Sequence, residues 1–217
     1  MFEKSQNRPI VFAETNFLFD CAFDRDANSQ HLLELAKLYR ITLSIPQFAF
    51  AEAKGQSEVI IRRRIEHLQL ALSSLRELQR TRRRTQQMMQ LINNLNDVIN
   101  QLEQEIIPTK ATIDRIAPAC NVIPYNTEIR ARAHLRVVER LPPFAENDCI
   151  IYESILWFAE QNRELDLTLL FLTRNRQDFD YPHIHQELGE FGMELLFSPG
   201  ECVRRIRELL ELQEEAS

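Results

Sequence analysis

The 217-residue sequence contains only four glycines, and none of them lies in a motif that cradles a nucleotide phosphate. Neither G-x-G-x-x-G nor G-x-x-x-x-G-K-[ST] occurs, which argues against the dinucleotide-binding and P-loop classes. The four cysteines are far apart and form no C-x-x-C pair. This spacing argues against a zinc knuckle or a redox motif, and it fits reduced thiols in a cytoplasmic protein.

The sequence also lacks long hydrophobic runs and an excess of positive charge. No run approaches the roughly eighteen apolar residues that span a bilayer, and the polar first eight residues lack the apolar core of a signal peptide. We therefore expect no membrane partner. The net charge of −6 means that any affinity for nucleic acid must come from a local basic surface.

Short apolar runs that alternate with amphipathic segments are present throughout the two ends of the chain. A length of 217 residues and a hydrophobic share of 44% suffice for one full core. The expected strands are 9–13, 41–45, 168–172 and 193–197, with 122–124 as a connecting extended piece. The expected helices are 28–38, 47–54, 109–117, 127–141, 146–161 and 199–213. This alternation predicts an α/β fold with a parallel sheet flanked by helices.

The middle of the chain has a different, heptad pattern. Two apolar seams repeat with 4-3 spacing, and they are out of phase with each other. They comprise Ile61, Ile65, Leu68, Leu72 and Leu75, and then Met88, Ile92, Leu95, Ile99, Leu102 and Ile106. We predict an inserted, coiled-coil-like α-helical hairpin over 56–107 between the two parts of one domain, 1–55 and 108–217. One long helix that pairs with another subunit, giving a homo-oligomer, is the alternative.

Acidic residues follow the expected strands. Glu14 ends the first strand, Glu52 and Asp148 lie in early helical turns, and Asp178 follows the strand at 168–172. In a parallel sheet, ligands bind at the carboxyl ends of the strands, so these acids are expected to converge. Carboxylates gathered in one cleft repel one another without a cation, and Mg²⁺ and Mn²⁺ prefer such oxygen ligands.

These segments together resemble a known family. Glu14-Thr15-Asn16, Glu52, Asp148 and the stretch 173–179 are similar to the PIN domain, the fold of the VapC-type toxin ribonucleases. The similarity covers about three quarters of the chain and leaves the insertion unexplained.

The resemblance implies a PIN-like fold and an endoribonuclease that depends on Mg²⁺ or Mn²⁺. By position, Glu14, Glu52 and Asp148 would hold the ion. Asn16 and Thr173 would orient these ligands, and Asn175 or Asp178 would complete the set. The resemblance also implies RNA as substrate and an antitoxin protein as a partner.

Two residues depart from the family pattern. The family usually has Asp where this chain has Glu14, and often has an acid where this chain has Asn175. A catalytically weak or inactive PIN-like module that binds RNA or protein through the helical insertion is therefore the alternative function. A haloacid-dehalogenase-like phosphatase is disfavoured because it needs Asp-x-Asp where Glu14-Thr15-Asn16 stands.

Several of these residues also have a purely structural interpretation. Glu52 fits a solvated surface acid, and Asp148 fits a helix-capping residue. Asn175 and Asp178 fit a turn. Asp20, Asp26 and Glu146 are expected as surface charges, and the arginines of 127–141 as its outer face.

Arginines are concentrated in the insertion. Eight of them lie between Arg62 and Arg84, against two acids. Those at the predicted tip are Arg80, Arg82, Arg83 and Arg84, and their guanidinium groups suit contacts with the RNA backbone. A solvated basic end, or a docking arm for an acidic antitoxin, are the other interpretations.

Overall fold

The computed structural model describes residues 8–81, 86–163 and 167–215. It divides into two compact units, Met1–Ala53 with Ile113–Ser217, and Lys54–Thr112. The assignment of 56–107 as an inserted domain stays a prediction. No helix among the described residues is long and apolar enough to cross a membrane.

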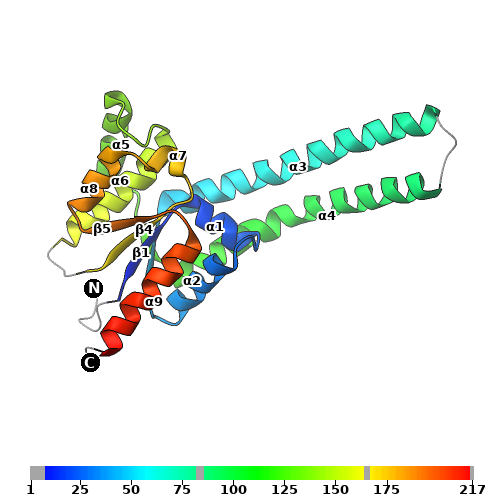
Figure 1. Cartoon of the computed structure of the whole chain (residues 1–217). Helices are drawn as coiled ribbons and strands as arrows, with labels where there is room; N and C mark the ends of the chain where they lie inside the picture. The colour runs from blue at the N-terminus through cyan, green and yellow to red at the C-terminus, as the bar shows by residue number, and fades with distance from the viewer. Residues whose placement is uncertain (1–7, 82–85, 164–166, 216–217) are drawn as a thin grey trace. The chain divides into compact units, whose positions relative to one another are not determined.

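The first unit contains a five-stranded sheet in which every neighbouring pair is parallel (Figure 1). The strand order is β3-β2-β1-β4-β5. The bounds are β1 Ile10–Ala13, β2 Thr42–Pro46, β3 Asn121–Ile123, β4 Leu169–Leu172 and β5 Met193–Leu196. All residues of β1 and β4 are buried, which explains why both strands are uninterrupted apolar runs. The predicted α/β class is confirmed.

Helices cover both faces of the sheet. α1, α2 and α9 lie on one face, and α5, α6 and α8 lie on the other (Figure 1). The bounds are α1 Thr15–Ala22, α2 Ala27–Lys37, α5 Thr127–Glu139, α6 Glu146–Gln161, α7 Arg176–Phe179, α8 Pro182–Gly189 and α9 Pro199–Glu215, with a 3-10 turn at Ala117–Ala119. An aromatic cluster of Tyr152, Phe171 and Phe179 packs α6 and α7 against β4. This packing fixes the first turn of α6 relative to the strand ends.

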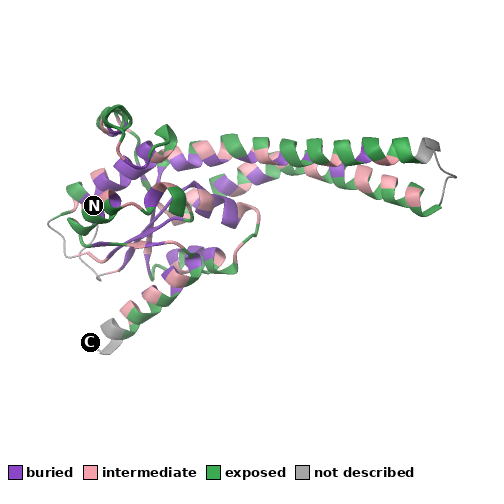
Figure 2. Cartoon of the chain, turned by 45° about the horizontal axis from the view of Figure 1, so that its top comes forward, coloured by how far each residue is buried: buried purple, intermediate pink, exposed green. Residues whose placement is uncertain are grey.

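The second unit is made of parts of two long helices, α3 (Gln47–Thr81) and α4 (Gln86–Ile116), which run antiparallel side by side (Figures 1 and 2). Every position of the two apolar seams is buried or half-buried, whereas most of its neighbours are exposed. Lys110 Nζ lies 2.6 Å from Glu58 Oε2, which joins the two helices. The predicted helical hairpin is confirmed, and a single continuous helix is wrong.

The expected break between the hairpin at 56–107 and a separate helix at 109–117 is wrong, because α4 continues through Pro108 to Ile116. A proline inside a helix removes one backbone donor and leaves the carbonyl four residues earlier without its usual partner. Pro108 is exposed, so that carbonyl can be hydrated. The side chain of Thr112 donates to the Pro108 carbonyl at 2.9 Å and supports the next turn.

Candidate active site

Glu14 lies at the end of β1, caps the N-terminus of α1, and is 4% exposed. Its carboxylate accepts hydrogen bonds from the backbone N–H and the side-chain amide of Asn16, at 3.0 and 2.9 Å. It also accepts from the Thr173 hydroxyl at 3.2 Å and the Arg174 N–H at 3.4 Å. Burial raises the pKa of Glu14, and these hydrogen bonds oppose the rise. Glu14 thus joins the ends of the neighbouring strands β1 and β4.

Glu52 lies in the second turn of α3 and is half-buried. Its carboxylate accepts a hydrogen bond from the hydroxyl of Thr15, in the first turn of α1. The side-chain amide of Asn147, in the first turn of α6, donates to its other oxygen at 2.7 Å. Glu52 is therefore held between the starts of two helices rather than projecting freely as a surface acid.

Asp148 lies in the first turn of α6, half-buried. Its pKa is raised to about 7, mainly by burial, and then by the negative charges of Asp178, Glu14 and Glu52. Within the described ranges, no hydrogen bond to its carboxylate is found, and α6 begins without a side-chain cap. The other three acids are therefore each close enough to repel the Asp148 carboxylate, and Asp148 makes no capping bond.

Asn175 and Asp178 lie together beyond β4. The Asn175 side-chain amide donates to Asp178 Oδ2 at 2.6 Å, and the Asn175 backbone N–H donates to the Thr173 hydroxyl oxygen at 3.0 Å. Thr173 thereby connects this pair to Glu14. The two candidates for the last ligand are joined by a hydrogen bond, so a change in one affects the other.

The donor set fits a divalent cation in its chemistry. All four acids offer oxygen ligands, and every influence on the pKa of Asp148 raises it, so no cation among the described residues compensates the charge of this carboxylate. In the part of the chain that the structure describes, no three His, Cys, Asp or Glu side chains are already placed around one point. Oxygens of Glu14 and Glu52 are instead turned towards the donors Asn16, Thr173, Thr15 and Asn147.

The arrangement includes residues that the sequence did not suggest. Thr15 and Asn147 donate to Glu52, and each directly follows or precedes a predicted acid. Arg174 bridges Asp20 and Asp26, at 3.0 and 2.5 Å. Asp20 is 3% exposed, so its assignment as a surface charge is wrong. Its burial raises its pKa, which the Arg174 charge partly opposes.

Arg82, Arg83 and Arg84 lie outside the described residues, and the Arg80 side chain is likewise not described. Their predicted contact with RNA stays a prediction.

The chain matches a family model and is similar to solved structures. A family model described as the PIN domain matches residues 11–179. A crystal structure of VapBC2 from Rickettsia felis, bound to a DNA fragment from its promoter, is similar at 14% identity. The match covers 86% of this chain and 97% of that chain, with a TM-score of 0.41. No curated protein matches the sequence.

Proposed function

Because the chain belongs to the PIN domain family, whose members are generally nucleases, we propose that it is a Mg²⁺- or Mn²⁺-dependent endoribonuclease. The observation that carries the proposal is the environment of the Asp148 carboxylate. This carboxylate is half-buried, accepts no hydrogen bond from the described residues, and is surrounded by three other acids. An uncompensated buried charge destabilises a fold, so such a group is typical of a functional site.

In this proposal Glu14, Glu52 and Asp148 hold the cation, and Asp178 completes the set together with Asn175. The cation would activate a water molecule for attack on phosphorus and neutralise charge on the phosphate. Asp148 has a pKa of about 7, so at neutral pH part of the population carries a proton on this carboxyl group. That proton is released when the cation binds, because the ligand must be ionised.

The neighbouring residues position these acids. Thr173, Asn16 and the Arg174 N–H hold Glu14 in one orientation. The longer side chain of Glu14, relative to the usual Asp, extends to the hydroxyl of Thr173 after β4. Thr15 and Asn147 hold Glu52 in the same way. Hydrogen bonds to metal-binding carboxylates typically matter nearly as much as the ligands themselves.

The partners of the protein are proposed from the same family membership. RNA is the substrate, and the arginines at 80 and 82–84 would contact its backbone. An antitoxin protein would regulate the enzyme if it is a toxin of a toxin–antitoxin pair. Self-association through the helical insertion is the remaining proposed contact.

Incubation of the purified protein with single-stranded RNA and Mn²⁺ tests the proposal. We expect cleavage that Asp148→Asn reduces by at least about 10- to 100-fold, since loss of residues that only support metal ligands typically costs that much. Asp97→Asn, at an exposed acid of α4, is the matched control and should cleave like the parent. RNA binding without cleavage at any Mn²⁺ or Mg²⁺ concentration would instead establish the non-catalytic module.

A second measurement does not depend on activity. A cation that binds only the folded protein raises its melting temperature by mass action. Mn²⁺ should therefore stabilise the parent and the Asp97→Asn variant, but not Asp148→Asn. Equal stabilisation of all three proteins would show that the ion binds elsewhere.

A further inference from the structure

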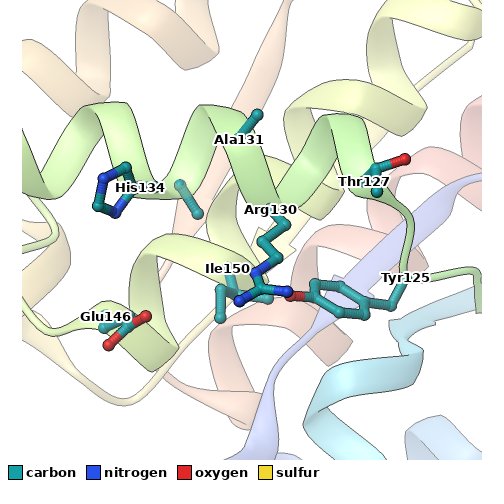
Figure 3. A pocket seen from close by; sticks show the side chains of 8 residues that line it. Tyr125, Thr127, Arg130, Ala131, His134, Glu146 and Ile150 are labelled. Carbon is teal, nitrogen blue, oxygen red and sulfur yellow. The ribbon is translucent and has the colours of Figure 1, made fainter.

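A pocket of about 380 Å³ lies between α5 and the first turn of α6 (Figure 3). It is lined by Tyr125, Thr127, Arg130, Ala131, Ala133, His134, Glu146 and Ile150. Its volume is within the range of pockets that hold small ligands or parts of larger ones. Its lining combines an aromatic ring, a cation and a carboxylate, so it suits a ligand that is both flat and polar.

The pocket adjoins the candidate active site through one helical turn. Glu146 and Ile150, four residues apart, lie on the same face of α6 and line the pocket. Asn147 and Asp148, in the same turn, belong to the candidate active site. Because Glu146 and Asp148 are two residues apart, they point to opposite sides of α6, so an RNA chain bound at both would pass around the N-terminus of this helix.

The arginines of α5 differ in what they contact. Arg132 pairs with Glu128 and Glu160 at 2.8 and 2.7 Å, and the buried Arg136 pairs with two further glutamates. Arg130 is exposed and lines the pocket, and its side chain makes no hydrogen bond or ion pair with any residue that the structure describes. Its guanidinium group is thus available to a ligand.

Tyr125 is fixed by its neighbours while its ring stays accessible. Its backbone N–H donates to Gln47 Oε1 at 3.1 Å, and its ring packs on Phe48 with centroids 5.8 Å apart. The residue is 38% exposed. In Figure 3 the side chains of Tyr125 and Arg130 point towards one another, and Glu146 and His134 lie on the opposite side of the pocket. A held, accessible aromatic ring is a stacking surface for a base.

We propose that this pocket is an RNA subsite that holds one nucleotide beside the cleaved bond. The proposal rests on the proposed ribonuclease function and adds the recognition of a flanking base. The base stacks on Tyr125, and Arg130 contacts the phosphate of the same nucleotide. The carboxylate of Glu146 accepts hydrogen bonds from the base edge. Guanine is the favoured base, because its N1–H and N2 amino group are adjacent donors that match the two oxygens of a carboxylate.

Binding of labelled single-stranded RNA to the full chain, without divalent cations so that no cleavage occurs, tests this subsite. Tyr125→Leu should weaken binding by about 5- to 150-fold, the range for loss of one stacked base. Arg130→Gln should weaken binding and reduce the salt dependence by roughly 0.7 in log–log slope, as expected for one phosphate contact. Arg132→Gln makes the same charge change on the same helix outside the pocket, and it should leave both values unchanged.

The role of Glu146 is tested with oligonucleotides that differ in one base. The parent should bind a guanine-containing oligonucleotide more tightly than its adenine, cytosine or uracil counterparts, and Glu146→Gln should remove this difference. Unchanged RNA affinity in Tyr125→Leu and Arg130→Gln, with circular dichroism showing folded variants, would overturn the subsite. RNA binding that depends on Tyr125 in a protein that never cleaves would retain the subsite and reject only the nuclease.

Discussion

Two groups of buried carboxylates in the first unit have opposite surroundings. In the first group, Arg136 is 5% exposed and lies 2.7 Å from both Glu153 and Glu187. It also donates to the Pro142 carbonyl at 2.6 Å, and its guanidinium lies over the ring of Tyr152. Every carboxylate there faces a cation, so the positive charge of Arg136 opposes the effect of burial on the pKa of Glu153.

The second group, at the strand ends, differs at Asp148. The pKa of Asp148 is raised to about 7 by burial and by three acids, and no cation among the described residues lowers it. The first group connects α5, α6 and α8 and stabilises the fold. In the second group, ionisation of Asp148 opposes folding, and an arrangement of that kind is expected where a bound cation restores the balance.

The largest expected effect on stability is in the first group, called the compensated group because Arg136 neutralises Glu153 and Glu187. Arg136→Met keeps most of the side-chain volume but leaves Glu153 buried without its cation. We expect the free energy of unfolding to fall by about 3–5 kcal/mol, as measured by urea denaturation. Arg132→Met, which removes two exposed ion pairs from the same helix, should cost about 1 kcal/mol or less. Equal losses in the two variants would contradict a stabilising role for the Arg136 group.

Replacement of Asp148 is expected to raise the stability of the metal-free protein rather than lower it. Its ordinary pKa is 3.8 and its folded pKa is about 7, so between these values the folded state binds a proton that the unfolded state has released. Stability therefore falls as pH rises from 3.8 to about 7, and the loss persists above pH 7. Asp148→Asn stays neutral and avoids this loss. Without divalent cations, its melting temperature above pH 7 should exceed that of the parent by about 2–8 °C.

The pH profile of that difference is the decisive measurement. The advantage of Asp148→Asn should shrink as pH falls from 7 towards 3.8. Addition of Mn²⁺ should reverse it above pH 7, because the ion stabilises the parent alone. A difference in melting temperature that does not change with pH would mean that the Asp148 carboxylate is solvated. Its charge would then not destabilise the fold.

Glu14, Glu52 and Asp178 could be predicted from the sequence because they follow apolar runs that are recognisable as strands, whereas Asp148 follows no strand and was placed by the family resemblance. Glu14 directly follows β1, so the local sequence alone places it at the end of a parallel strand. The contacts among the acids required the structure, because the direction of a side chain such as that of Asn147 depends on how α6 packs. The edge strand β3 was missed as well, since it has three residues and Val122 is 38% exposed.

The compensated group could not be predicted. Arg136 was expected on an outer, solvated face of 127–141, and this is wrong. Its partners Glu153 and Glu187 lie on other helices, and no local pattern identifies a charge that is neutralised across elements. A similar limit hid the burial of Asp20, whose partner Arg174 is 154 residues away in the sequence.

A smaller effect is expected at Thr173, which supports the second group. Its hydroxyl donates to Glu14 and accepts from the Asn175 N–H. Thr173→Val keeps the shape and removes both bonds, so the free energy of unfolding should fall by about 1–3 kcal/mol. Mn²⁺ affinity, measured by thermal stabilisation, should fall by about 10- to 100-fold. Thr173→Ser retains the hydroxyl and should restore the affinity; if it does not, Thr173 acts through packing instead.

The smallest effect is expected for Glu58 in the second unit, a carboxylate that has two cations but is 32% exposed at its side chain. Lys110 and Arg62 lower the pKa of Glu58 to about 2, so their contribution is present above pH 4.5 and is lost as pH falls towards 2. Water and salt screen such a pair, and Glu58→Gln should change the melting temperature by less than about 2 °C. If Glu58→Gln lost as much stability as Arg136→Met, ion pairing would be sufficient to explain the stability of the compensated group. Burial of the pair would then not be required. A small loss leaves burial as the property that makes Arg136 stabilising and Asp148 destabilising.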